Sequence, residues 1–212
     1  MKKFFVVVFV LCGAVLLASG CSMRNGYSNP MADIDIPEGS YSNGAGYTIE
    51  KLDDTSCAIT GVYLTDSILD VPASIDGLAV TKIGQYAFND LPAVEINLPD
   101  TVTDVAMCAI ANCNNLTTIR FGSCLKTFGV FGVTSCPSLT ELVFPVGFTT
   151  FEGCPISGDM GSLKVIDVPE SVDVVPSDFA LIKGHYDLKI VAQEGTGMAK
   201  FADDMGLPLE IK

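Results

Sequence analysis

The sequence predicts a β-rich repeat solenoid, in which short strands from successive repeats stack into a parallel ladder joined by short turns or helical turns. Two recurring segments predict it. One segment, with an apolar residue, two polar residues, an apolar residue and a small residue, starts at residues 80, 102, 125, 148 and 172. The other, with leucine, two free positions, an aliphatic residue and then a Pro or Gly breaker, recurs between these starts. A repeat of about 23 residues with one short strand cannot bury its own apolar face, so it must stack on its neighbours.

The first segment is clearest in Val80–Phe88 and Val102–Ile110, which both carry an Ala followed by a large apolar residue near their ends. The later copies run from Leu125, Phe148 and Val172, and they replace this pair by Gly132-Val133, Pro155-Ile156 and Phe179-Ala180. The replacements make regular helical turns doubtful in the later repeats.

The second segment gives the strands of the ladder. Full copies run from Leu116 to Gly122, from Leu139 to Pro145 and from Leu163 to Pro169. An earlier copy ending at Pro99 is one residue short, so either Ala93 or Val94 fills its leucine position. Because side chains alternate along a strand, the aliphatic residues point inward and their neighbours outward.

The outward strand positions form a surface of mixed charge, which we call the candidate binding face. It consists of Glu95, Asn97, Thr118, Arg120, Glu141, Val143, Val165 and Asp167. The neighbouring segments add many threonines. Two interpretations remain open: a solvated face where β-branched threonine suits a strand, or a contact surface for a protein or glycan.

The N-terminus carries an export signal. Lys2 and Lys3 precede an apolar run, Phe4–Leu17, that is short for a membrane-spanning helix and ends in small residues before Cys21. The alternative is an uncleaved anchor. We expect a signal peptide over residues 1–20, a flexible tether over 21–46 that is rich in Ser, Asn, Gly and Pro, and one repeat domain over 47–212.

The segment Leu17–Cys21 resembles a bacterial lipobox, although Ala18 stands where leucine is commonest. The resemblance implies that the Cys21 thiol is acylated and becomes the new N-terminus. Several acyl chains hold a protein durably on a bilayer. We therefore expect an exported protein of the bacterial cell envelope or surface that is held to a membrane by a lipid anchor without spanning it.

The order V-x-x-I-G-x-x-A-F-x-x-C-x-x-L-x-x-I-x-L-P resembles the BspA-like leucine-rich repeat of bacterial surface proteins. The best matches are Val80–Phe88, Val102–Cys113 and Cys136–Pro145. Residues 47–80 resemble the strand pair that opens such domains, and residues 190–208 resemble their terminal strand and short helix. The resemblance implies adhesion to host matrix or to other bacteria.

Composition excludes one large class of partner. The chain has 12 Lys and Arg against 25 Asp and Glu, a formal net charge of −13, although 49% of its residues are hydrophobic. Nucleic-acid binding needs a stripe of Lys and Arg that releases counterions from phosphates, and the sequence has none. We therefore expect no nucleic-acid partner.

Six cysteines remain beyond Cys12 and Cys21. Cys113 and Cys136 occupy one position of adjacent repeats, and in the family pattern this position faces the core. Adjacent repeats place their Cα atoms within disulfide range, and export permits oxidation. We favour unlinked stacked thiols, because Met160 and Leu91 fill the same position in other repeats. Cys108 and Cys154 lie two repeats apart, too far for a bond. Without a C-x-x-C pair or Cys/His cluster, we expect no metal site.

No motif points to catalysis or to a cofactor. His185, the single histidine, lies in a loop sequence without a matching nucleophile, and no phosphate-binding loop is present. The paired carboxylates Asp53-Asp54 and Asp203-Asp204 lie on predicted turns, where most such pairs are solvated charge. A hydrolase or a calcium site built on surface carboxylates is the remaining, disfavoured alternative.

The resulting hypothesis is a non-enzymatic surface lipoprotein whose ladder face binds a macromolecule: a host matrix protein, a glycan or another bacterial surface protein. The chief alternative is a structural or assembly role, in which the domain pairs with a co-exported partner of the envelope. Fold alone does not decide between them.

Overall fold

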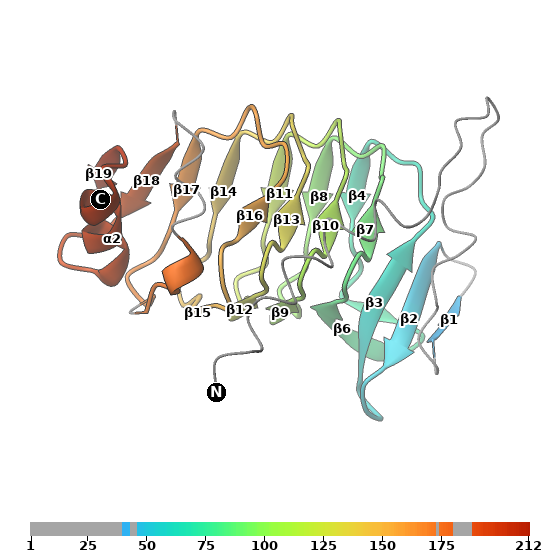
Figure 1. The fold of residues 1–212 in the computed structure, drawn as a ribbon. Helices are drawn as coiled ribbons and strands as arrows, with labels where there is room; N and C mark the ends of the chain where they lie inside the picture. Colours follow the sequence, from blue (N-terminus) through green and yellow to red (C-terminus); the bar gives the residue numbers. More distant parts are fainter. Residues whose placement is uncertain (1–39, 43–45, 173, 180–187) are drawn as a thin grey trace, which may run out of the picture. The chain divides into compact units, whose positions relative to one another are not determined.

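The structure is a computed structural model, and it describes residues 40–42, 46–172, 174–179 and 188–212. The segment 1–20, Cys21 and His185 lie outside the described residues. The chain divides into two compact units, Met1–Asp35 and Ile36–Lys212, and everything described belongs to the second. Figure 1 shows its strands stacked in chain order from β3 to β18.

Three columns of short strands build the stack, and one turn through all three is called a coil here. The first column contains β6 (Leu78–Ile83), β9 (Asp104–Val105), β12 (Thr127–Phe128) and β15 (Thr150–Phe151). The second contains β7 (Phe88–Asn89), β10 (Ile110–Ala111), β13 (Val133–Thr134) and β16 (Ile156–Ser157). The third contains β4 (Ile68–Asp70), β8 (Glu95–Asn97), β11 (Thr118–Arg120), β14 (Glu141–Val143), β17 (Val165–Asp167) and β18 (Lys189–Ala192).

Within each column the strands pair in parallel and in register. Ile83 is opposite Val105, for example, and Ile110 is opposite both Phe88 and Val133. The inward residue of every coil therefore stacks on the same position of the next. These inward side chains are buried and form one continuous core between the three columns. The solenoid predicted from the 23-residue period is confirmed.

Left-handed backbone conformations turn the chain at the corners beside the second column. Tyr86, Cys108 and Phe131 precede the strands of this column with φ near +50°, and Asp90, Asn112 and Ser135 follow them with similar values. Such φ values are costly for most L-residues, although Asn and Asp tolerate them best. The neighbouring coil fixes each corner through backbone hydrogen bonds, such as that from Asn112 N to Thr134 O at 3.0 Å.

A β-hairpin covers the N-terminal end of the stack. Strands β2 (Tyr47–Lys51) and β3 (Ser56–Val62) pair antiparallel, β1 (Ser40–Ser42) pairs with β2, and β3 continues the first column by pairing parallel with β6. Strand β5 (Ser74–Ile75) returns into β6 through Asp76-Gly77, both with positive φ, as a two-residue hairpin turn requires. The strand pair expected at residues 47–80 is present.

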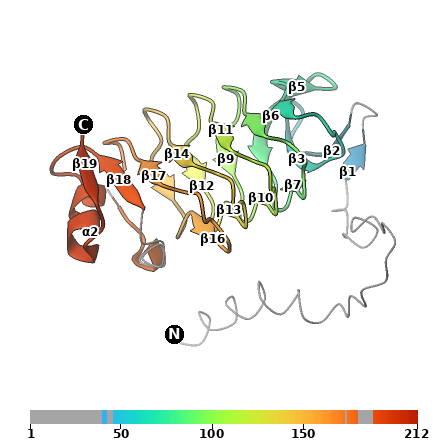
Figure 2. The same ribbon diagram turned by 90° about the horizontal axis from the view of Figure 1, so that it is seen from above.

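The C-terminal end is covered by helix α2 (Gly197–Met205) and by strand β19 (Leu209–Ile211), which adds to β18 (Figure 2). The Thr196 hydroxyl accepts a hydrogen bond from Ala199 N at the start of the helix, and Gly206 ends it at φ +66°. Met198, Ala199 and Ala202 bury the inner side of the helix. The terminal strand and short helix are therefore confirmed, whereas Asp203-Asp204 lies on this helix instead of a turn.

Phenylalanine rings fill the core of the later coils. Phe121, Phe128, Phe144, Phe148 and Phe151 contact one another with ring centroids 4.6–6.5 Å apart. The Ala87 position becomes Gly132 in this region because a Cβ there would lie 2.4 Å from the Phe128 ring. At Gly132, the departure from the Ala-Phe pair thus accommodates a ring contributed by the first column.

The structure also settles the short early copy of the strand segment. Ala93 is buried at 2% exposure, whereas Val94 is 41% exposed, so Ala93 takes the leucine position. In the described part of the regions where helical turns were in question, the chain forms the second strand column and, at residues 177–179, a 3₁₀ turn. Among the described residues, no helix is long and apolar enough to cross a membrane.

We expect Ile119→Asp to unfold the domain. Ile119 is 6% exposed between Ile96 and the inner side chains of the next coil, and an unpaired carboxylate there costs several kcal/mol, comparable with the roughly 5–15 kcal/mol of an ordinary domain. The control is Val143→Asp, which introduces the same charge at an outward position that is 44% exposed. Urea unfolding followed by circular dichroism measures both. A folded Ile119→Asp protein of unchanged stability would show that the assigned register is wrong.

Candidate functional site

The outward positions of the third column form two straight rows. One row contains Ile68, Glu95 and Thr118 and continues with Glu141, Val165 and Lys189; the other contains Asp70, Asn97 and Arg120 and continues with Val143, Asp167 and Val191. All eight residues of the candidate binding face lie in these rows. The inward residues between them are buried, so each outward side chain stands on a packed core.

Two sheets make up this column, and they meet between β11 and β14. A backbone hydrogen bond from Thr140 N to Thr117 O, 3.4 Å long, joins the two sheets at this junction. The face is therefore one surface along the whole stack. Beyond the predicted residues it includes Lys189 on β18 and Glu210 on β19, whereas Val191 in the same rows is buried. The sequence analysis found no sign of Glu210, because β19 follows a helix and carries no repeat pattern.

Two polar side-chain pairs link neighbouring strands in the N-terminal part of the face, on β4, β8 and β11. Arg120 Nε donates to Glu95 Oε1 at 2.9 Å across two neighbouring strands, and Asn97 Nδ2 donates to Asp70 Oδ1 at 2.7 Å. The hydrogen bond from Arg120 lowers the pKa of Glu95, with a further contribution from Asn97. Both pairs are exposed to solvent and contribute little to stability. They do fix the directions of these side chains on the face.

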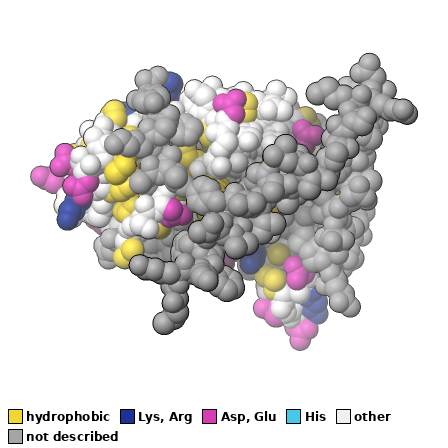
Figure 3. Space-filling view, in the orientation of Figure 1, with side chains coloured by type: hydrophobic (Ala, Val, Ile, Leu, Met, Phe, Trp, Pro, Cys, Tyr) yellow, Lys and Arg dark blue, Asp and Glu magenta, His cyan; other side chains and the backbone are white. Residues whose placement is uncertain are grey.

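The other end of the face is also lined with ion pairs. Lys189 Nζ lies 2.5 Å from Glu210 Oε2, and Lys212 pairs with Asp167. In the space-filling view, acidic side chains stand among apolar and uncharged ones over the C-terminal elements (Figure 3).

Two valines, Val143 and Val165, stand among the charged residues in the middle of the face and are called the apolar step here. Val143 is 44% exposed on β14, and Val165 is half-buried on β17 beside exposed Glu141. The register places Val143 opposite Asp167 and Glu141 opposite Val165. The two valines are thus diagonal neighbours, within reach of one bound side chain.

The threonines have a structural role that the sequence analysis did not identify. The hydroxyls of Thr103, Thr117, Thr140 and Thr149 each donate to a backbone carbonyl of the preceding coil, at 3.1–3.2 Å. Each spans 22 or 23 residues of sequence. Threonine at these positions therefore links one coil to the next. This explains threonines that flank the face, and it favours neither of the two interpretations of the face itself.

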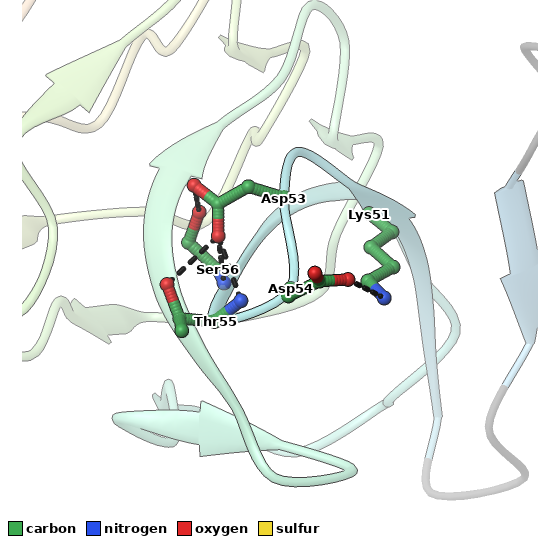
Figure 4. A network of polar contacts seen from close by, with 5 residues as sticks. All are labelled: Lys51, Asp53, Asp54, Thr55 and Ser56. Atoms are coloured by element: carbon green, nitrogen blue, oxygen red, sulfur yellow. Dashed lines mark hydrogen bonds and ion pairs between the residues drawn. The ribbon is translucent and has the colours of Figure 1, made fainter.

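The carboxylate pair Asp53-Asp54 belongs to the turn between β2 and β3 (Figure 4). Asp53 accepts hydrogen bonds from the backbone N–H and hydroxyl of both Thr55 and Ser56, at 2.7–2.9 Å. These bonds, led by that from Thr55 N, lower the pKa of Asp53 to about 2. Asp54 pairs with Lys51 at 2.9 Å. Both carboxylates are accounted for by the turn itself.

No group of three or more His, Cys, Asp or Glu side chains with the geometry of a metal site occurs in the described part of the chain. The six described cysteines are thiols that form no disulfide; Cys57, Cys108, Cys113, Cys136 and Cys154 are buried and Cys124 is exposed. Cys113 and Cys136 contact each other, as their shared position in adjacent coils predicts.

Comparison with protein families finds a profile described as "BspA type Leucine rich repeat region", which matches six copies over residues 73–180. The chain belongs to this family. The matched segment contains the three strand columns from β6 to β17, which is the part of the structure where the coils are most regular. The family resemblance seen in the sequence is confirmed.

Solved leucine-rich repeat proteins share this fold. The chain is 24% identical to a leucine-rich repeat protein from Bacteroides capillosus, with a TM-score of 0.52 over 60% of this chain and 96% of that one. A leucine-rich cell surface protein from Faecalibacterium prausnitzii gives 22% identity and a TM-score of 0.59, covering 71% of this chain. The leucine-rich repeat protein of T. pallidum gives 21% and 0.57, covering 71% of this chain and 70% of that one.

The relatives differ in length. The chain spans 38% of the Faecalibacterium prausnitzii protein, although it spans nearly all of the Bacteroides capillosus protein. A search of curated proteins found no match. These similarities establish the fold and leave the ligand to be proposed.

The Asp53 turn predicts a pH dependence of stability. Its carboxyl has a pKa of about 2 in the folded chain and close to 4 when unfolded, so the unfolded chain takes up the proton first as pH falls. The stabilisation is complete above about pH 4 and disappears as pH falls through about 2. We expect the unfolding free energy of the Asp53→Asn variant to fall less steeply across this window. Urea titrations at several pH values measure it, and identical slopes for both proteins would contradict the expectation.

Proposed function

We propose that the chain is an exported, lipid-anchored surface protein without catalytic activity, whose candidate binding face binds another macromolecule. The ligand class is a protein or glycan of a host surface or of a neighbouring cell. The repeat family and the cell-surface protein among the structural neighbours support surface binding in general terms. Long regular faces are the part of a solenoid that commonly engages partners.

The apolar step in the middle of the face is the observation that carries the proposal. Val143 and Val165 lie diagonally on β14 and β17, with the Arg120–Glu95 pair on the strands before them. Asp167, which pairs with Lys212, lies opposite Val143 on β17. Apolar contact area surrounded by polar groups is the usual arrangement of a recognition surface. Since the strands beneath are in register and packed, the face requires little reorganisation on binding, which favours affinity.

Export and anchoring rest on the N-terminal sequence. Lys2 and Lys3, the apolar run to Leu17 and the lipobox-like segment ending at Cys21 support cleavage after residue 20 and acylation of Cys21. Residues 21–46 would then separate the domain from the membrane as a tether. An acidic protein held in this way is repelled by anionic headgroups, which favours a position away from the bilayer.

The second candidate function is assembly with a co-exported partner in the envelope. The same face would serve it, so the geometry favours neither version. Crosslinking in intact cells separates the two, because one stoichiometric envelope partner fits assembly and a ligand supplied from outside fits adhesion.

Binding is tested with residues 46–212 in a solid-phase assay against matrix proteins, mucins and neighbouring cells. We expect saturable binding to one of them and at least a tenfold weaker affinity for Val143→Asp, equal to about 1.4 kcal/mol, because the new charge stands in the apolar step. Met107→Asp is the matched control: Met107 is 37% exposed at the corner between β9 and β10, away from this face. Equal losses in the two variants, or no saturable binding at all, would reject the adhesion proposal.

Anchoring is tested separately in cells. Cys21→Ala should abolish labelling with a fatty-acid analogue and release the protein from membranes, because it removes the thiol that would be acylated. Fractionation and gel fluorescence measure both effects, and Cys124→Ala, which removes an exposed thiol within the domain, serves as the control. Continued membrane association of the unlabelled Cys21→Ala protein would indicate the uncleaved anchor instead.

A further inference from the structure

Two cysteine side chains that are not part of the candidate binding face contact each other inside the core. Cys113 and Cys136 each follow the second strand column by two residues, in adjacent coils. The strands before them are in register, with Ala111 opposite Thr134, and Asn112 N donates to Thr134 O at 3.0 Å. Register carried forward by two residues places the two cysteines opposite each other, with Cα atoms about 4.8 Å apart by the ladder spacing. That spacing lies inside the range that disulfides bridge.

The two side chains also adopt the same orientation. Cys113 Sγ donates to Ala111 O at 3.3 Å, and Cys136 Sγ donates to Thr134 O at 3.4 Å, so each thiol contacts the carbonyl two residues before it. Equal orientations in stacked coils bring the sulfurs over one another. The two thiols are accordingly close enough to influence each other, and both side chains are fully buried.

We propose that Cys113 and Cys136 are an oxidative modification site, at which a disulfide links two adjacent coils of the solenoid. A small aliphatic disulfide is the oxidant. The thiolate of one cysteine attacks it and releases one thiol, and the second cysteine then displaces the other thiol from the mixed disulfide. The pair loses two protons and two electrons, and the reagent gains both as two thiols.

The interaction between the two thiols supports this chemistry. Donation by the Cys113 thiol to the Cys136 thiolate lowers the pKa of Cys136, and the same interaction together with burial raises the pKa of Cys113. Exchange begins at the thiolate, so Cys136 is the expected attacking sulfur. Because neither sulfur reaches solvent in the closed stack, the bond must form while the coils assemble or when a coil opens.

The other cysteines provide an internal comparison. The position of Cys113 and Cys136 is filled by Leu91 in the coil before and by Met160 in the coil after, both buried, so packing alone does not require sulfur pairs there. Cys108 and Cys154 also share a position, but a coil without cysteine at this position lies between them. Only one pair among the described cysteines is therefore placed to form a bond between adjacent coils.

The test uses the full chain, refolded from urea with a mixture of oxidised and reduced glutathione. Remaining thiols are alkylated, and the protein is digested with trypsin without reduction. We expect one cross-link, between the peptide 83–120, which holds Cys108 and Cys113, and the peptide 127–164, which holds Cys136 and Cys154. The linked protein should unfold about 5 °C or more above the reduced protein, and a thiol reductant should remove the difference.

Matched variants assign the bond. The cross-link must persist in Cys108→Ala and disappear in Cys113→Ala; if the latter does not fold, Cys113→Met replaces it, because the position accepts Met160. A cross-link that survives the loss of Cys113 overturns the proposal. So does full alkylation of all cysteines after oxidative refolding. Neither outcome depends on whether the candidate binding face has a ligand.

Discussion

Pairing between coils is the interaction on which the rest of the structure depends. An isolated coil, with strands of two or three residues, would leave its backbone N–H and C=O groups unpaired on both sides. It would also leave its inward side chains exposed to water. Stacking satisfies all of these at once, since the same hydrogen bonds that join the strands superimpose the aliphatic side chains. The two ends lack a neighbour, and the hairpin of β2 and β3 and helix α2 cover them with buried side chains of their own.

Much of the stack could be predicted from the sequence because the core is periodic. Aliphatic residues such as Ile96 and Ile119 recur at one spacing, and their burial follows from that spacing alone. The second strand column could not be predicted, because two-residue strands carry too little pattern. The positive φ values of Tyr86 and Phe131 also lacked a local signal: neither residue favours that conformation, and only the hydrogen bonds of the next coil select it.

The candidate binding face was partly predictable for the same reason. Strand alternation placed Glu95, Arg120 and Val143 outward, and the structure places them there in two rows. The pairing of Arg120 with Glu95 depends on distances across strands, which sequence spacing does not supply. The threonines show the opposite case. Their enrichment was visible, but hydroxyl bonds such as that from Thr140 to Thr117 O explain much of it without a ligand.

Where the repeat departs from a constant length, the change lies at a corner. The register offset between coils is 22 residues from Phe88 to Ile110 but 23 from Ile96 to Ile119, and it becomes 24 between Leu142 and Ile166. The added residues fall between columns, the last of them in the turn around Gly158. For a gene that encodes such a chain, a duplication or deletion of one whole coil preserves the backbone pairing between neighbours. Insertion or deletion of one codon within a strand reverses the inward and outward sides of the residues that follow it in that strand. Variation in length should therefore arise by whole repeats.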